Sequence, residues 1–313
     1  MSFIPEPQTL APRRPGGRAA GRAAVRAAVR VPSAAHVVVA GLRVLATGVL
    51  AIVVLGTGQA RAQSVERDER DTLRVCADAN LLPYSNRQGQ GYENRLARML
   101  GDHLGIPVAY QWWPQTMGFV RNTLNKRTCD VVLSINAENE MVLNTNPYYR
   151  SVYTLVYRSD LGIEIDSLDH PIAGDLRYGV VEKTPAVSLL RAHGYTKLRP
   201  YQLTTDTRSR KPAQQAVIDV AKGVVDAAIV WGPIAGYEAA QLDTPLTVVP
   251  LVNETVGTQL SFAITMGVRR GQLAWKHQLN DFIRANRGTI RQLLAGYHIP
   301  LVDDDGRLIE VSQ

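Results

Sequence analysis

The spacing of hydrophobic and polar residues predicts alternating strands and helices over residues 73–149. Apolar runs of the length of a buried strand lie at Leu73–Ala77, Pro107–Trp113 and Asp130–Ile135. Between the first two runs, Tyr92–Leu104 has apolar residues at helical spacing and is followed by Gly105, so we expect a helix there. A second helix is expected over Gly118–Asn125. This alternation implies a parallel sheet, and in open α/β sheets ligands lie beyond the carboxyl ends of the strands.

A second series of the same kind follows, and two β-prone segments connect it to the first. Tyr148–Arg158 leads out of the first series, and residues 260–270 lead back into it. The strands expected between them are Leu176–Val181, Ala227–Trp231 and residues 246–251, and the expected helices are Ala186–His193 and Ala213–Lys222. One crossing out and one back predict an α/β fold with two Rossmann-like lobes joined by a two-strand hinge. We assign residues 63–157 plus 259–313 to lobe 1 and residues 158–258 to lobe 2.

The last part of the chain is expected to form two amphipathic helices. One helix has Trp275, Leu279, Phe282 and Ile283 on a single face, and the other has Ile290, Leu293, Leu294 and Tyr297. We interpret both stripes as core packing. His103 lies on the apolar face of the helix Tyr92–Leu104, and we interpret it as a half-buried face residue rather than a ligand.

Residues 1–62 have the pattern of a targeting segment. Arginines recur through Arg43, the apolar run VLATGVLAIVVLG follows, and Ala60-Arg61-Ala62 forms a small-x-small cleavage site before Gln63. The apolar run is shorter than the roughly 20 residues of a permanent membrane span. We therefore expect a cleavable signal peptide and a periplasmic protein with no membrane attachment after cleavage. An uncleaved anchor is the alternative.

The positive charge of the chain belongs to this leader. The 313 residues carry a formal net charge of +7, with 35 basic and 28 acidic residues. Residues 1–62 contain eight arginines and one acid, Glu6, so 27 residues of each sign remain in the following 251 residues. A neutral mature chain gives no support for nucleic acid or anionic membrane partners. Its length suffices for one large domain or two smaller ones.

Two cysteines, Cys76 and Cys129, lie in or beside expected strands of the same sheet. An even number of cysteines in an exported chain favours a disulfide. Two separate buried thiols are the alternative, because the sequence does not give the Cα separation that a bridge requires.

No sequence motif supports catalysis or a resident cofactor. The chain has no G-x-S-x-G elbow, no phosphate-binding G-x-x-x-x-G-K-[ST] loop, no H-E-x-x-H pair and no C-x-x-C-H haem site. The acids Asp303-Asp304-Asp305 are consecutive rather than alternate, so we interpret them as a solvated turn and not as a calcium loop. We expect no catalytic residue, no metal and no cofactor.

An ordered set of motifs is similar to a known family. These are the first strand Leu73–Ala77, the G-[FY]-[DE] helix start Gly91-Tyr92-Glu93, the G-x-x-D strand entry at Arg127–Asp130 without its glycine, and the hinge approach Pro147-Tyr148-Tyr149. In this order they resemble a type 2 periplasmic solute-binding protein of extracellular family 3. The resemblance covers nearly all of the expected mature chain and implies the two-lobed binding-protein fold.

Longer sequence segments resemble one subgroup of this family. CADANLLPYSN, GYENRLARMLGDHLG, WWPQTMGFVRNTL, CDVVLSI and PYYRSVYTLVYR are similar to the quinoprotein-dehydrogenase-associated members of the family, the J proteins encoded beside methanol dehydrogenases. The resemblance implies a partner: a periplasmic quinoprotein (methanol or alcohol) dehydrogenase that uses pyrroloquinoline quinone (PQQ), its c-type cytochrome, or both. An accessory or maturation role is the usual inference for that group.

Two departures separate the chain from amino-acid-binding members of the family. Those proteins place an arginine a few residues beyond the third strand, where it clamps a ligand carboxylate through two hydrogen bonds. Here the segment 136–140 reads NAENE and has no arginine. They also tend to carry an aspartate after the late lobe-2 strand, where this chain has Trp231-Gly232-Pro233. A zwitterionic amino acid is therefore not the expected ligand.

The expected cleft is rich in aromatic and amide side chains. Its candidate residues are Asn80, Pro83, Tyr84, Trp112, Trp113, Ser134, Asn136, Tyr148, Tyr149, Lys183, Thr184 and Trp231. Aromatic walls with few polar groups suit a small apolar or alcohol-like ligand, or part of a protein partner. The alternative is structural: Trp112, Trp113 and Tyr148 pack within the lobe, and Thr184 with Pro185 starts a helix.

Three hypotheses follow. The favoured one is a non-catalytic accessory protein of the dehydrogenase system that acts through protein contact, with an apolar ligand in the cleft, as a monomer. The second is the substrate-binding protein of an ABC importer for a small non-amino-acid solute. The third is an enzyme on the binding-protein fold, for which Glu182 and Lys183 are the first candidates.

Overall fold

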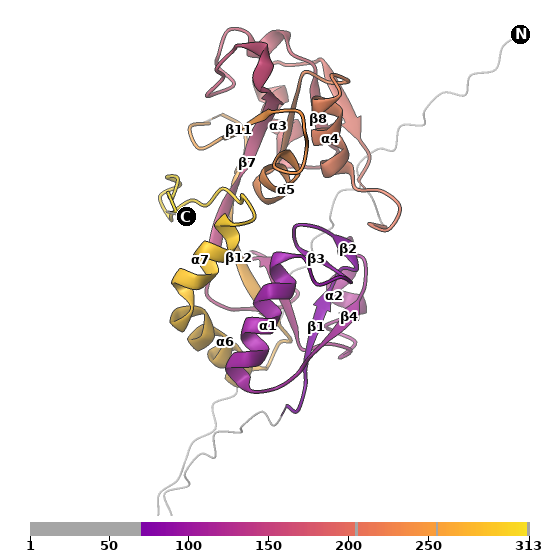
Figure 1. Ribbon diagram of the computed structural model, residues 1–313, viewed down its shortest axis with the longest axis vertical. Coiled ribbons are helices and arrows are strands. Elements are labelled where there is room, and N and C mark those ends of the chain that lie inside the picture. Colours follow the sequence, from indigo (N-terminus) through magenta and orange to yellow (C-terminus); the bar gives the residue numbers. More distant parts are fainter. Residues whose placement is uncertain (1–69, 204–205, 255, 312–313) are drawn as a thin grey trace, which may run out of the picture. The chain divides into compact units, whose positions relative to one another are not determined.

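The computed structural model describes residues 70–203, 206–254 and 256–311. Figure 1 shows the arrangement of the helices and strands in this part of the chain. The expected leader, residues 1–62, and its cleavage site lie outside the described residues. In the described part of the chain, one mixed sheet contains eight strands in the spatial order β4 (Val108–Trp112), β1 (Leu73–Ala77), β5 (Val131–Asn136), β12 (Ser261–Val268), β7 (Tyr149–Arg158), β10 (Ala227–Trp231), β8 (Tyr178–Val181) and β9 (Leu198–Tyr201), with two more strands paired beside this path.

Lobe 1 is built on a parallel core of three strands. β1 (Leu73–Ala77) pairs in parallel with β4 (Val108–Trp112) on one side and with β5 (Val131–Asn136) on the other. Alternate residues of these strands face opposite sides of the sheet, so Val75 and Cys76 belong to different core clusters. All three strands confirm the sequence prediction within one residue at each end.

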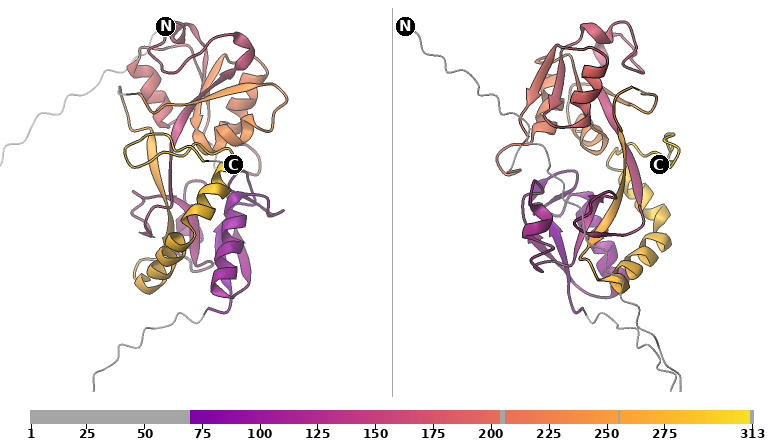
Figure 2. Two further views of the ribbon diagram at one scale, coloured as in Figure 1. Left: turned by 60° about the vertical axis from the view of Figure 1, so that its left-hand side comes forward. Right: turned by 180° about the vertical axis from the view of Figure 1, so that it is seen from behind.

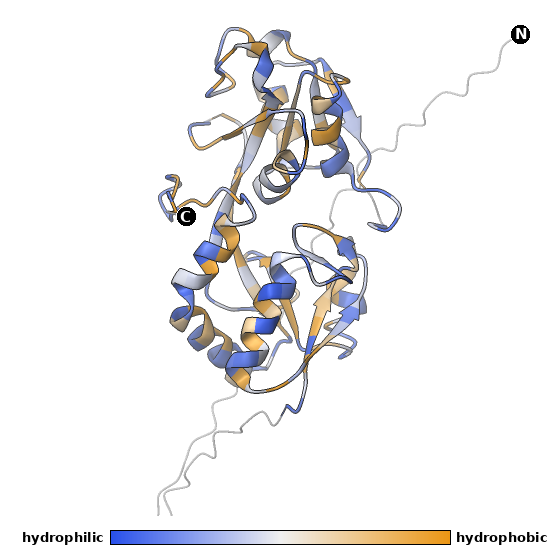
Figure 3. Ribbon diagram, in the orientation of Figure 1, coloured by the Kyte–Doolittle hydropathy of each residue, from blue (hydrophilic) through white to orange (hydrophobic). Residues whose placement is uncertain are grey.

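Three helices cover one face of the lobe-1 sheet. They are α1 (Tyr92–Leu104), α6 (Leu273–Ala285) and α7 (Arg287–Ala295). Figure 2 shows α1 beside the C-terminal helices, although they are far apart in the sequence. Trp275, Leu279, Phe282 and Ile283 are all buried, which confirms the predicted apolar stripe. Figure 3 shows the alternation of hydrophobic and hydrophilic residues along these helices that such packing produces.

Lobe 2 is also built on three parallel strands with helices packed against them. β8 (Tyr178–Val181) lies between β10 (Ala227–Trp231) and β9 (Leu198–Tyr201), and all three strands run parallel. Its helices are α3 (Pro185–Ala192), α4 (Pro212–Ala221) and α5 (Gly232–Ala239). The apolar faces of α3 and α4 pack on opposite sides of these strands, and each packing layer forms its own buried cluster.

Two long strands connect the lobes. β7 (Tyr149–Arg158) pairs with β12 (Ser261–Val268) through its first residues, and with β10 and β11 (Leu246–Pro250) through the rest. This confirms the predicted pair of crossings, one outgoing and one returning. β7 runs through the 157/158 boundary, and β12 begins only at Ser261, so the boundaries at 157/158 and 258/259 stay predictions.

Several elements differ from the sequence prediction. The helix expected over Gly118–Asn125 is only one turn long, α2 (Phe119–Asn122), because Thr123 leaves helical geometry and turns follow. The expected loop after β1 contains a small hairpin of β2 (Asn80–Leu81) and β3 (Ser85–Asn86). Tertiary contacts, which the pattern does not contain, decide these short elements.

Three further elements were not predicted. The strand β6 (Leu143–Asn144) pairs with β12 and has only two residues. The strand β9 contains Pro200 and has an exposed face, as an edge strand does. Helix α5 begins at Gly232-Pro233, a pair that normally indicates a break, but proline is well tolerated in a first helical turn.

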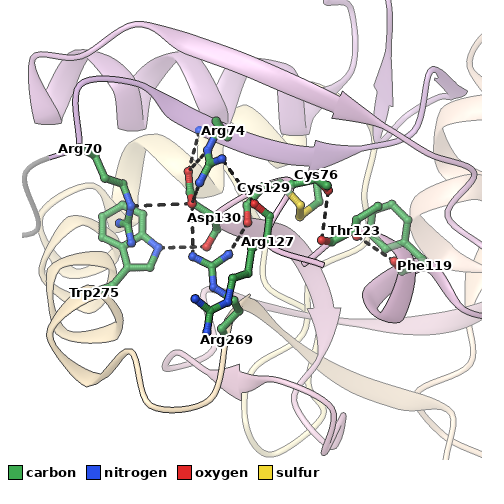
Figure 4. The surroundings of a disulfide bond; sticks show 11 residues. Arg70, Arg74, Cys76, Phe119, Thr123, Arg127, Cys129, Asp130, Arg269 and Trp275 are labelled. Carbon is green, nitrogen blue, oxygen red and sulfur yellow. Dashed lines mark hydrogen bonds and ion pairs between the residues drawn. A yellow bond between two sulfur atoms is a disulfide. The ribbon is translucent and has the colours of Figure 1, made fainter. Parts of the chain in front are cut away.

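The disulfide Cys76–Cys129 is present, with a Cα–Cα distance of 5.4 Å, which confirms the prediction. It ties β1 to the residue before the buried Asp130. Figure 4 shows that arginines surround the Asp130 carboxylate, and Arg74 donates to it at 2.7 Å and 2.9 Å. Arg269 approaches the same group at 3.3 Å, and the Trp275 indole donates to the Asp130 carbonyl at 3.2 Å. This end of the sheet is therefore cross-linked, and its buried carboxylate is paired with arginines.

Candidate ligand-binding site

A cavity of about 390 Å³ lies between the two lobes. The end of β5 contributes Ser134, Ile135 and Asn136 to its wall, and the end of β10 contributes Ile229–Trp231. Val181, at the end of β8, also lines the cavity. The carboxyl ends of the parallel strands in both lobes therefore meet at the cavity, as expected for ligand sites in open α/β sheets. Its volume is in the range of small-molecule sites.

The wall of the cavity is mostly apolar and aromatic. Its aromatic residues are Tyr84, Tyr149, Tyr153 and Trp231. Of the described residues that line it, Lys211 is the only one with a charged side chain, and its ammonium donates to Asn80 Oδ1 at 2.9 Å. No arginine is among these residues, so the described wall cannot form the bidentate clamp that holds a carboxylate.

Trp231 joins the aromatic groups of the two lobes. Its ring centroid lies 5.4 Å from that of Tyr153 and 5.8 Å from that of Phe262. Its side chain also lies close to the Tyr84 hydroxyl from lobe 1. Burial raises the pKa of Tyr84 and raises that of Tyr153 to about 12. Both phenols are therefore neutral at physiological pH and contribute rings and hydroxyls rather than charge.

The residue after Trp231 cannot carry a side chain. A Cβ on Gly232 would lie 2.5 Å from the Val152 carbonyl oxygen and 2.5 Å from Pro300 Cγ. Real Cβ atoms do not approach other atoms so closely. An aspartate, which amino-acid-binding proteins of this fold tend to carry after the same strand, therefore has no room at Gly232, and a tryptophan occupies the preceding position.

Glu93 lies behind the cavity wall, in the first turn of α1, and is 2% exposed. Helix α1 begins directly against the hairpin that precedes it, because a Cβ on Gly91 would lie 2.0 Å from the Tyr84 carbonyl oxygen. The backbone N–H of Glu93 donates to this same carbonyl at 2.9 Å. Burial, together with the nearby Asp78 carboxylate, raises the pKa of Glu93 to about 7. The group therefore titrates near physiological pH.

Asp78 is equally buried but well hydrogen-bonded. It follows β1, is 1% exposed, and accepts backbone N–H groups from Asn80 at 2.8 Å and Gln115 at 2.7 Å. The hydroxyl of Thr207, from lobe 2, donates to it at 2.7 Å. These three donors satisfy the oxygens of the Asp78 side chain at the side of the cavity.

Further hydrogen bonds join the lobes around Asp78. The Asn80 amide donates to the Thr207 carbonyl at 3.3 Å, and the Gln214 amide donates to the Leu82 carbonyl at 2.7 Å. Together with the Lys211–Asn80 contact, they connect the loop after β1 to residues 207–214 of lobe 2. The cavity is therefore bounded on this side by direct contacts between the lobes.

The structure places six predicted site residues on the cavity wall: Tyr84, Ser134, Asn136, Tyr149, Thr184 and Trp231. Two others lie beside it. Asn80 takes part in the contacts between the lobes, and the Tyr148 hydroxyl lies 2.8 Å from Ser134 Oγ. Pro83 is buried, and its carbonyl accepts the N–H of Tyr92 at the start of α1.

The remaining predicted residues lie away from the cavity. Trp112 stacks on Tyr110 with 4.7 Å between ring centroids, and Trp113 is 40% exposed. Lys183 is exposed and lines a separate groove with Glu182. The structure thus gives no support for Glu182 and Lys183 as a catalytic pair in the cavity.

Sequence reasoning missed Glu93, Asp78 and Gln115 as site residues. Glu93 was recognised only as part of a helix-start motif. Asp78 directly follows a predicted strand, and this position is a signal that could have identified it. Gln115 and the lobe-2 residue Thr207 have no local signal, because only the folded chain brings them to the site.

Metal binding and membrane insertion find no support within the described ranges. No group of three or more His, Cys, Asp or Glu residues there could hold a metal ion. The Asp303–Asp305 run forms a turn in which Arg307 pairs with Asp303 at 3.0 Å. Among the same residues, no helix has the length and apolar character needed to cross a membrane.

The fold and the cavity define the class of protein. The chain belongs to the bacterial extracellular solute-binding proteins, family 3, whose family model matches residues 73–298. This confirms the resemblance seen in the motifs.

Particular relatives narrow the class. The chain is 28% identical over 257 residues to protein MoxJ of Methylorubrum extorquens, covering 77% of this chain and 85% of MoxJ. It is 29% identical over 266 residues to protein MoxJ of Paracoccus denitrificans, covering 80% and 96%. The crystal structure of the periplasmic binding protein XoxJ from Methylobacterium extorquens matches with a TM-score of 0.64 and 34% identity, over 74% of this chain and 100% of XoxJ. The chain is therefore a binding protein similar to MoxJ and XoxJ.

Proposed function

We propose that this protein is a non-catalytic periplasmic accessory protein of a PQQ-dependent methanol or alcohol dehydrogenase system. The observation that carries the proposal is the match to XoxJ over the whole of that chain at 34% identity. The two MoxJ proteins support it, since the J proteins are encoded beside methanol dehydrogenases. The absence of an arginine from the described cavity wall also speaks against an amino-acid receptor.

The rim of the cavity suits contact with another protein. Met117 from lobe 1 is 83% exposed and Leu203 from lobe 2 is 48% exposed, and both line the cavity. Exposed apolar side chains around a concave site are typical of protein interaction surfaces. The partner in this proposal is the quinoprotein dehydrogenase, its c-type cytochrome, or both.

Surface plasmon resonance tests the proposal directly. The purified chain is immobilised, and a purified methanol dehydrogenase and its cytochrome are passed over it separately. Met117→Ser and Leu203→Ser should each weaken binding by about 1 kcal/mol or more, which is the usual threshold for an energetically important interface residue. Trp231→Ala should weaken it too, provided that its circular dichroism spectrum is unchanged.

The matched control is Leu273→Ser. Leu273 is 58% exposed at the start of α6, away from the cavity, so its replacement should leave binding unchanged. Failure of both proteins to bind the unaltered chain would contradict the proposal, as would equal loss in the control variant.

The second candidate function is the substrate-binding protein of an ABC importer for a small non-amino-acid solute. The observation that favours it is the cavity of about 390 Å³ bounded by hydrogen bonds between the lobes. A saturable solute that makes the protein more compact in small-angle X-ray scattering would support this candidate over the accessory role.

The proposal includes export to the periplasm through a cleaved signal peptide, and a monomeric protein without a cofactor. Mass spectrometry of the protein purified from its native host should find Gln63 as the first residue. A longer N-terminus in the membrane fraction would favour the anchored alternative.

A further inference from the structure

Two buried acceptors beside the cavity have no hydrogen-bond partner among the described residues. They are Oε1 of Glu93 and Oε1 of Gln115. Gln115 lines the cavity, and its Nε2 donates to the Ser134 carbonyl at 3.3 Å, so the amide group is held with its oxygen unpaired. Buried acceptors without partners are uncommon in native proteins and require an explanation. A ligand with hydrogen-bond donors provides one.

The hydroxyls beside Glu93 also serve other acceptors. Tyr148 donates to the Leu133 carbonyl at 2.9 Å, because a carbonyl can only accept. Ser134, 2.8 Å from the Tyr148 oxygen, must then donate to Tyr148. Tyr92, 3.0 Å from Ser134 Oγ, in turn donates to Ser134. The single proton of Ser134 is therefore shared between the Tyr148 oxygen and the Glu93 carboxyl.

The second hydroxyl beside Glu93, that of Ser85, also hydrogen-bonds to another acceptor. Ser85 Oγ donates to the Asp78 carbonyl at 2.9 Å and accepts the Asp78 N–H at 3.0 Å. The groups that act on the Glu93 carboxyl are Ser134, Ser85 and the Asp78 carboxylate, and no described cation is among them. An ionised Glu93 therefore has no described cation as its counter-ion, and its Oε1 has no described hydrogen-bond donor.

The cavity wall in front of Glu93 is aromatic. Tyr84 and Tyr149 line the cavity, and both lie close enough to Glu93 for its charge to raise their pKa. Tyr153 and Trp231 complete the aromatic part of the wall. Faces of tyrosine and tryptophan rings attract organic cations, most strongly where water is excluded. The charged lining residue Lys211 donates to Asn80 Oδ1, and its charge acts on the Glu238 carboxyl.

We propose that the cavity is a binding site for a small alkylammonium ion, with Glu93 as its buried counter-ion and Gln115 Oε1 as a hydrogen-bond acceptor. The aromatic side chains contact the alkyl part and the positive charge. This inference goes beyond the accessory role, which names no ligand charge, and it applies to the isolated protein.

Binding of such a cation is linked to pH. A cation stabilises the ionised form of Glu93, whose pKa in the empty site is raised to about 7. Below this pH the carboxyl must release its proton before the ion pair forms. Affinity should therefore fall about tenfold from pH 8 to pH 6, with release of one proton per ligand at pH 6.

Isothermal titration calorimetry on the purified full chain tests this inference. The probes are n-butylammonium and 1-butanol, which have the same alkyl chain and differ in the charged head group. At pH 8 we expect n-butylammonium to bind at least about tenfold more tightly than 1-butanol, since the interaction with a buried charge is strong at low dielectric. Titrations at pH 6 in buffers of different ionisation enthalpy measure the released proton.

Variants identify the groups responsible. Glu93→Gln should abolish both the preference for the cation and the pH dependence, and Gln115→Met should weaken binding several-fold without changing the pH dependence. The matched control is Asp102→Asn, because Asp102 is an exposed acid on the same helix and should not affect binding. Thermal melts establish that each variant is folded.

Three results would overturn the inference: equal binding of the two probes, no binding of n-butylammonium, or an unchanged pH dependence in a folded Glu93→Gln variant. None of these experiments contains the dehydrogenase. A failure here therefore leaves the accessory role standing, and a failure to bind the dehydrogenase leaves the cation site standing.

Discussion

Each end of the lobe-1 sheet buries a carboxyl group, and the pKa values of Asp130 at one end and Glu93 at the other are shifted in opposite directions. Asp130 lies at the amino end of β5, is 1% exposed, and has arginines on several sides. Glu93 lies by the carboxyl ends of the strands, is 2% exposed, and has no described cation beside it. Burial alone raises the pKa of any carboxyl, but hydrogen bonds and charge from Arg74 hold the pKa of Asp130 below its usual range. Without such partners, the pKa of Glu93 is raised to about 7.

We interpret the Asp130 end of this sheet as contributing to stability and the Glu93 end as contributing to ligand binding. The Asp130 end is compensated in charge, and the disulfide Cys76–Cys129 cross-links it. The Glu93 end keeps an unpaired acceptor beside a cavity, which is unfavourable for folding unless a ligand uses it. Strain and uncompensated polar groups are expected to gather at functional sites. Four predictions test the comparison.

The largest expected effect comes from removing the disulfide. The double variant Cys76→Ala, Cys129→Ala opens a loop with a sequence separation of 53 residues. Chain entropy predicts a loss of about 4 kcal/mol in the free energy of unfolding. Urea denaturation followed by circular dichroism measures it. Reduction of the unaltered protein should give a similar loss, and a change below about 1 kcal/mol in both would show that this end needs no cross-link.

The second prediction removes the charge of Asp130. Asp130→Asn leaves its arginines uncompensated and should lower the free energy of unfolding by about 3 kcal/mol at pH 7. Because the pKa of Asp130 is lowered in the folded state, its contribution exists above the unfolded pKa and is lost as the pH falls through the folded pKa. The difference between variant and wild type should therefore shrink below about pH 4.

The control for this prediction is Asp281→Asn. Asp281 pairs with Arg284 on the surface of α6, and both side chains are largely exposed. Exposed pairs contribute about 0.5 kcal/mol or less. Equal losses in the two variants would contradict the special role of the Asp130 cluster.

The third prediction concerns Glu93, whose pKa is raised rather than lowered, so its effect on stability depends on pH in the opposite sense. Its pKa is raised from 4.5 to about 7 on folding, so the folded state binds the proton more tightly and stability falls as the pH rises from about 4.5 to 7. Glu93→Gln removes this penalty and should stabilise the protein by about 3 kcal/mol at pH 8, with little effect at pH 4.5. Urea denaturation at both pH values measures the change. A destabilised variant at pH 8 would show that the ionised carboxylate has an unseen partner.

The smallest effect is expected between the lobes. Thr207→Val removes the hydroxyl that donates to Asp78 at 2.7 Å and should lower the free energy of unfolding by about 1 kcal/mol. Ser209→Ala is the control, since its hydroxyl donates to an exposed neighbouring carbonyl at 3.1 Å. Hydrogen exchange of residues 78–82 should increase only in the first variant. No change there would mean that this contact does not hold the lobes together.

The hydrophobic pattern was sufficient for most of the fold. The helix Tyr92–Leu104 was predicted with both of its ends, because an apolar stripe and Gly105 are local signals. The hydrophobic pattern was less reliable for short elements such as α2 and β6, whose hydrogen bonds depend on distant neighbours. The strands β7 and β12 were recognised as crossings because each is a long β-prone segment between two complete series.

The candidate site was predictable only in part. Tyr84, Ser134 and Trp231 line the cavity because each lies at or just after the carboxyl end of a strand or in the loop that follows, which the topology brings together. Trp112 and Trp113 are equally aromatic, but they lie on and beyond an edge strand and are directed elsewhere. Residue type alone does not separate these cases.

The sequence by itself determined the class of fold, the placement of the two cysteines in or beside strands of one sheet, and the absence of an arginine beyond β5, since these depend on local pattern and composition. Only the tertiary structure decided the charge state of the buried acids. Asp130 and Glu93 look alike in the sequence, as acids at the start of a strand and of a helix. Packing placed arginines around the first and left the second without a described cation beside it, and this difference in neighbours sets their pKa values in opposite directions.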